Sequence, residues 1–111
     1  MIFYDNIHKV RYNEVLSLMS STDVYHKSLA YLMALNDDMY LRKDRLFSFS
    51  DDMIIPDGLN EGWQTGYTRA VTKLMFNLWN ESNKCDVSDV FCWDSNLSEC
   101  MWQAIRIRFE I

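Results

Sequence analysis

The sequence predicts a mainly α-helical protein, a compact bundle of about five helices with an irregular or short extended segment around residues 47–62. Three observations indicate this class. The 111 residues include only three glycines and one proline, whereas all-β folds need many turn residues. Apolar residues make up 49% of the chain and recur at helical spacing. The length fits one domain, residues 1–111.

Two helices are expected in the first third of the chain. The first covers residues 4–19, and the second covers residues 22–35 with Thr22 as its N-cap. Ser20 and Ser21 separate them. The apolar residues of the first helix fall into a stripe that we expect to be buried: Phe3, Ile7, Val10, Val15, Leu18 and Met19.

The middle of the chain is predicted to be less regular. Residues 36–38 resemble a cap or turn, and a short third helix is expected over residues 39–47. Phe47 and Phe49 then alternate with serines, which favours a short strand or extended arm. The Pro56-Asp57-Gly58 sequence predicts a turn in which glycine accepts a positive φ.

The strongest helix signal spans residues 65–79, where apolar residues recur over three turns. Thr65 is its expected N-cap. Gly66 has two alternative roles: it allows another backbone segment to approach closely, or it is simply the residue at which the helix begins. After a polar loop, Ser88 is expected to cap a short turn, and a last helix covers residues 97–109.

The formal net charge is −5. An acidic domain is a poor candidate for direct nucleic-acid binding and suits a protein partner with a basic surface, although modest negative charge also simply keeps a protein soluble. The chain lacks an apolar run long enough for a membrane span and begins without the pattern of a signal peptide, so the cytoplasm is the expected compartment. Four tryptophans in so short a chain make a homodimer plausible.

Three cysteines in the last quarter of the chain are candidate zinc ligands: Cys85, Cys92 and Cys100. Their spacings in the sequence are wider than the close pairs typical of zinc sites. With His26, or His8, as the fourth ligand they would form a structural Cys₃His site. The alternative is that free cysteines behave as small buried hydrophobic residues. No catalytic residues are expected, because the sequence has no nucleophile elbow, phosphate loop or paired-histidine motif.

Acidic residues near the middle of the chain are candidates for contact with a basic partner. The alternative is that they are simply solvated surface. Trp63 is a candidate anchor, since tryptophan is favoured at interaction hot spots. The candidate partner-binding residues are Asp37, Asp38, Asp51, Asp52, Asp57, Glu61 and Trp63.

Several segments together resemble a family of small domains of unknown function from Firmicutes, their phages and mobile elements. The most specific are Trp63-Gln64-Thr65-Gly66 and Phe76-Asn77-Leu78-Trp79-Asn80, and Ala104-Ile105 with Ile107-Arg108-Phe109 adds to them. The likeness covers nearly the whole chain. It supplies no catalytic residues, and family members often carry an aromatic residue where His26 and Cys100 stand. The setting that the resemblance implies is that of anti-CRISPR and other counter-defence proteins.

Three functional hypotheses follow. The first is a small acidic, non-catalytic inhibitor that binds a host defence protein in a bacterial cell, most concretely an anti-CRISPR that blocks a Cas9-type nuclease. The second is a zinc-stabilised structural or regulatory module. The third is a phage nucleic-acid-associated protein, which requires the basic residues to gather on one face: Arg42, Lys43, Arg45, Arg69, Lys73, Arg106 and Arg108.

Overall fold

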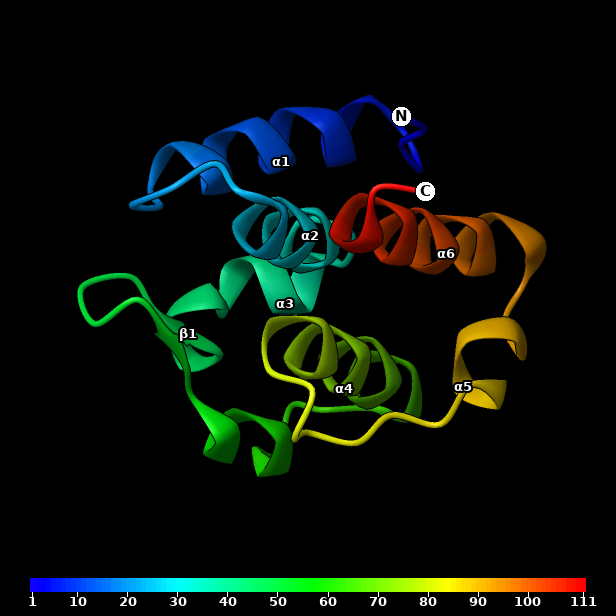
Figure 1. The fold of residues 1–111 in the computed structure, drawn as a ribbon. Coiled ribbons are helices and arrows are strands. Elements are labelled where there is room, and N and C mark those ends of the chain that lie inside the picture. Colours follow the sequence, from blue (N-terminus) through cyan, green and yellow to red (C-terminus); the bar gives the residue numbers. More distant parts are fainter.

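Helices of different lengths surround a central helix in the computed structural model, which describes residues 1–111 (Figure 1). One short hairpin projects from the side, and the predicted mainly α class is confirmed. In chain order the elements are α1 (Asn6–Ser17), α2 (Val24–Met33), α3 (Asp37–Leu41), η1 (Lys43–Arg45), β1 (Phe47–Ser48), β2 (Met53–Ile54), η2 (Pro56–Asn60), α4 (Gly66–Trp79), α5 (Ser88–Phe91) and α6 (Ser95–Phe109).

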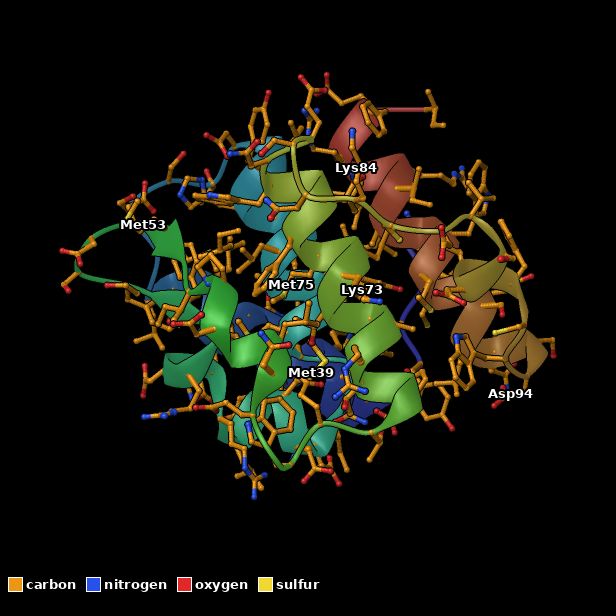
Figure 2. All side chains as sticks on the ribbon, turned by 90° about the horizontal axis from the view of Figure 1, so that it is seen from below. Met39, Met53, Lys73, Met75, Lys84 and Asp94 are labelled. Carbon is orange, nitrogen blue, oxygen red and sulfur yellow. The ribbon has the colours of Figure 1, made fainter.

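The central helix is α2, which packs against α1, α4 and α6. Every residue from Ser28 to Met33 is buried, so α2 has no solvent-facing side over this stretch. A helix that is apolar on all sides is stable only when neighbours cover it completely. The hydrophobic core therefore forms around α2. Figure 2 shows Met39 and Met75 inside the molecule, and both are fully buried, whereas Met53 lies at the outer edge of the hairpin.

The strongest predicted helix is confirmed as α4, and its predicted N-cap is also confirmed. The Thr65 side chain accepts a hydrogen bond from the Thr68 backbone N–H, and the Thr68 hydroxyl accepts one from the Thr65 N–H. This reciprocal capping box satisfies two backbone donors at the helix start. Val71, Leu74 and Leu78 are buried on the inner side of α4, as the periodicity predicts.

The buried face of α1 differs from the predicted one. Of the predicted stripe, Val15 is buried as expected, but Ile7, Val10 and Leu18 are exposed, and His8 and Tyr12 are buried in their place. The cause is a tertiary contact. The His8 Nε2–H donates to the Tyr31 carbonyl oxygen at 2.8 Å, and the Tyr4 N–H donates to His8 Nδ1 at 3.0 Å. Because both ring nitrogens are satisfied, a polar residue can occupy the buried side of the helix.

Several predicted boundaries and caps were also wrong. Asp23, not Thr22, caps α2, since its carboxylate accepts the His26 backbone N–H. The third helix begins at Asp37, capped by Asn36, and ends at Leu41. Ser88 begins α5 but makes no capping hydrogen bond. The last helix begins two residues earlier than predicted because Asp94 caps it.

The extended segment predicted at residues 47–62 is an antiparallel hairpin followed by η2. Phe47 pairs with Ile54, and Ser48 pairs with Met53. Gly58 does not adopt the predicted positive φ. It is required for a different reason: a Cβ there would overlap the Arg45 carbonyl oxygen and lie 2.8 Å from Leu46 Cδ2.

Gly58 and Gly66 give a matched test of this packing. Replacement Gly58→Ala is expected to lower the free energy of unfolding by about 1–3 kcal/mol, because the backbone of η1 must move to admit the methyl group. Gly66→Ala, where nothing lies within 4 Å of an added Cβ, should leave stability unchanged or raise it by up to about 1 kcal/mol. Urea denaturation measures both. Equal effects of the two replacements would contradict the close approach at Gly58.

Candidate functional site

Most of the net negative charge lies in one stretch of the chain, residues 37–63, called here the acidic segment. It contains seven carboxylates and three basic side chains, a net charge of −4 out of the −5 of the whole protein. The segment comprises α3, η1, the hairpin and η2; in Figure 1, α3 lies at the centre of the view beneath α2, and the chain continues from it to the hairpin at the left and to η2 below the hairpin. Folding brings three of these carboxylates to one surface hollow, Asp44, Asp57 and Glu61, whereas Asp37 and Asp38 line another.

A chain of charged and aromatic contacts links α3 to the end of η2. Arg42 Nη1 donates to Asp38 Oδ1 at 3.0 Å, and the Arg42 guanidinium lies 5.4 Å from the centre of the Trp63 ring. The Trp63 Nε1–H donates to Glu61 Oε1 at 2.8 Å. The Glu61 carboxylate also accepts hydrogen bonds from Nε and Nη2 of Arg45. These hydrogen bonds, together with the one from Trp63, lower the pKa of Glu61. Trp63 is half-buried and held in a fixed position.

A second set of contacts joins the acidic segment to α1. Arg11 forms an ion pair with Asp37 and lies 4.4 Å from the centre of the Tyr40 ring. The Tyr40 hydroxyl donates to Glu14 Oε1 at 2.7 Å. Exposed ion pairs of this kind contribute little stability individually. Their consequence here is that the side chains of α3 are ordered against α1.

Three carboxylates of the segment remain without an ion pair: Asp44, Asp51 and Asp57. Two of them, Asp44 and Asp57, line a surface hollow of about 270 Å³ together with Arg45, Gly58 and Glu61. Sequence reasoning missed Asp44, because it lies among basic residues and its position beside Asp57 arises only from the turn at Gly58. Of the predicted partner-binding residues, four are already paired within the protein: Asp37, Asp38, Asp52 and Glu61.

The largest cavity, about 480 Å³, lies beside the start of α3 and is open to solvent. Its walls include Arg11, Asp37, Asp38 and Tyr67. The Tyr67 hydroxyl is buried and has no hydrogen-bond partner, and burial raises its pKa above the ordinary range. Both named carboxylates are already paired within the protein, Asp37 with Arg11 and Asp38 with Arg42.

The tip of the hairpin is fixed to α2 through His26. Its Nδ1 lies 2.7 Å from Asp23 Oδ1, and its Nε2 lies 2.8 Å from Asp52 Oδ1. Carboxylates only accept hydrogen bonds, so both ring nitrogens must carry protons and the ring is an imidazolium. Burial acts to lower the pKa of His26, but the hydrogen bonds to Asp23 and Asp52 outweigh it, and the pKa is raised. Asp52 itself adopts a left-handed φ of 56°, which aspartate tolerates.

His8 is in the opposite state. It is buried, donates through Nε2 to a backbone carbonyl and accepts at Nδ1 from a backbone N–H, which defines a neutral ring. Burial is the main cause that lowers the pKa of His8, and the hydrogen bond to Tyr31 opposes it only in part. The two histidines are therefore structural, one charged and one neutral.

The predicted zinc ligands are not brought together. The structure contains no group of three or more His, Cys, Asp or Glu side chains placed to hold a metal ion. His26 has both ring nitrogens bound to carboxylates, Cys92 is exposed and Cys100 is buried near Tyr31. Burial also raises the pKa of Cys85 and of Cys100, which favours the thiol over the metal-binding thiolate.

Three of the basic residues that nucleic-acid binding would use are engaged within the protein. Arg42 and Arg45 are paired with carboxylates. Arg108 lies over the Tyr25 ring at 3.8 Å and donates to the Leu78 carbonyl oxygen at 2.9 Å.

No helix is both long and apolar enough to span a bilayer.

Comparison with known proteins places the chain in one family. Residues 1–111 match a family of unknown function, DUF6075. The chain belongs to this family. No curated protein and no solved structure matches it. The DUF6075 match agrees with the resemblance to a small domain of unknown function and covers all the elements described above.

The two histidines predict opposite pH dependences. The raised pKa of His26 gives stability that is complete below the unfolded value of 6.5 and is lost as pH rises through the folded pKa. The lowered pKa of His8 gives stability that is complete above 6.5 and is lost as pH falls through the folded pKa. His26→Gln should therefore lower the free energy of unfolding, relative to the wild type, by more at about pH 5.5 than at about pH 8.5. His8→Gln should lower it by less at about pH 5.5 than at about pH 8.5.

Urea denaturation of the wild type and both variants at the two pH values measures these differences. Each variant serves as the control for the other. A His26→Gln deficit that grows with rising pH would contradict the charged Asp23–His26–Asp52 cluster.

Proposed function

We propose that this protein is a small non-catalytic inhibitor that binds a basic surface of a host defence protein through its acidic segment. The observation that supports this most strongly is the charge distribution. Residues 37–63 hold a net charge of −4, whereas residues 1–36 are neutral and residues 64–111 have a net charge of −1. A concentration of one sign of charge on one side steers association with an oppositely charged partner.

The geometry of the segment supports binding to a rigid target. The contacts from Asp38 through Arg42, Trp63 and Glu61 to Arg45 order long side chains before any partner arrives. Such preorganisation reduces the entropy lost on binding. The three unpaired carboxylates of the segment stay free to pair with lysines or arginines of the partner.

The partner that we propose is a Cas9-type nuclease. Such nucleases hold nucleic acid in a strongly basic channel, and an acidic protein can occupy part of that channel. The setting implied by the sequence resemblance, in phages and mobile elements of Firmicutes, supports the same choice, and the site of action is then the cytoplasm of the bacterial host. The function requires neither a cofactor nor a catalytic residue.

The triple variant Asp44→Asn, Asp51→Asn, Asp57→Asn tests the proposal. It removes the three unpaired carboxylates and leaves the ion-pair chain intact, so the fold should be retained. We expect the purified wild type to bind the nuclease and protect target DNA from cleavage. The triple variant should bind at least about ten-fold more weakly, mainly through a lower association rate. Interferometry at two salt concentrations and a cleavage assay measure these effects.

The matched control is Glu81→Gln, Asp86→Asn, Asp89→Asn, which changes the net charge equally but lies outside the acidic segment. Equal weakening by both triple variants would show that only the overall charge matters and would contradict the assigned surface. Failure of the wild type to bind any CRISPR nuclease would overturn the choice of partner.

A further inference from the structure

The side of the molecule formed by α5 and α6 exposes a strip of large apolar residues. Phe91 is 54% exposed, Trp102 42% and Phe109 55%. The rings of Phe91 and Trp102 lie 6.3 Å apart, so these two form one surface. We call the strip, with the hollows beside it, the α5–α6 groove.

Two adjoining hollows make up the groove. One, of about 280 Å³, is lined almost entirely by hydrophobic residues of α4, α5, α6 and the loop before α5, and the other, of about 360 Å³, lies next to it along α6. They share Phe91 and Trp102. An aromatic side chain offers about 150–250 Å² of surface, so three of them half-exposed present roughly 300 Å² of contiguous apolar area. A patch of this size is comparable to the largest apolar patch on a typical monomer, which is often functional.

The charges beside the groove indicate what covers it. Glu99 and Arg106 are both exposed and lie seven residues apart on α6. Seven residues fall within about 20° of two full helical turns, so the two side chains share the outer face of the helix. Trp102 lies between them in the sequence. Neither pairs with an oppositely charged side chain of the protein. The only side-chain hydrogen bond of either is from Arg106 Nε to a main-chain oxygen of Ile111, the last residue of the sequence, at 3.2 Å, which leaves the Nη groups of Arg106 free.

This arrangement is complementary to itself. In an antiparallel pair of α6 helices related by a two-fold axis beside Trp102, Glu99 of each copy faces Arg106 of the other. Both pairs form at once, because a two-fold interface brings the same patch of each subunit together. The two tryptophans and the flanking phenylalanines then cover each other in the centre, where apolar contacts exclude water.

We propose that the α5–α6 groove is a dimer interface occupied by a second copy of this chain, with α6 packed antiparallel to its counterpart and Glu99 paired with Arg106 at both ends. The apolar area is smaller than the roughly 800 Å² per partner of a standard interface, so we expect a weak dimer that forms only as concentration rises. This proposal does not depend on the acidic segment, which belongs to a different part of the surface: Figure 1 shows the hairpin and α5 at opposite ends of the molecule.

Sedimentation velocity across a wide range of protein concentrations tests the proposal. We expect the wild type to change from monomer to dimer as concentration rises. Glu99→Arg alone, or Arg106→Glu alone, places like charges opposite one another twice per dimer and should weaken association by about ten-fold. The double variant Glu99→Arg, Arg106→Glu exchanges the charges and should restore the dimer.

Restoration by the double variant is specific to the antiparallel geometry, because it requires position 99 of one copy to face position 106 of the other. Both residues are exposed, so circular dichroism should show the same helical content in all variants. Glu81→Arg, outside the groove, is the control and should leave association unchanged. A chain that stays monomeric at every concentration, or a dimer that the single reversals do not weaken or the double variant does not restore, would overturn the proposal.

Discussion

Complete burial of α2 is the constraint on which the rest of the structure depends. Leu29, Tyr31 and Leu32 point to different sides of this helix, and each is buried. Full burial of a large apolar side chain contributes about 1.5–3 kcal/mol, so a gap on any side of α2 would be costly. The chain meets this demand with α1, α4 and α6, which cover α2 from different directions. Each outer helix therefore packs where it covers a group of apolar side chains of α2.

Polar groups on α2 attach two further elements, α1 and the hairpin. The Tyr31 carbonyl oxygen accepts from His8 and orients α1, while His26 at the start of α2 holds the hairpin through Asp52. The two histidines differ in charge because their partners differ: a carbonyl and an amide stabilise a neutral ring, and two carboxylates stabilise an imidazolium. Since the hairpin is part of the acidic segment, the surface proposed to bind a partner is anchored to the core through His26.

Sequence reasoning succeeded where the signal was local. The limits of α4 were predicted to within a residue, because helical spacing and the Thr65 cap both lie within the segment itself. The buried face of α1 was wrong, because the hydrogen bond that buries His8 comes from a residue 23 positions away. The concentration of carboxylates could be predicted from composition, but their pairing with Arg11 and Arg45 depends on tertiary contacts. The predicted zinc ligands were chosen for residue type and for the position of the three cysteines in the last quarter of the chain, and the fold does not gather them.

The surface divides into two parts with different physical character. Negative charge is concentrated in residues 37–63, whereas residues 64–111, which supply the α5–α6 groove, hold six acidic and five basic side chains in near balance. A groove with balanced charge can approach its own copy without the repulsion that two acidic segments would experience. Pairing through α6 then leaves both acidic segments exposed on one particle. A partner with two basic sites within reach would be bound more tightly than by either segment alone, because the second contact forms at high effective concentration. Self-association and binding to a basic partner are therefore compatible, and each can strengthen the other.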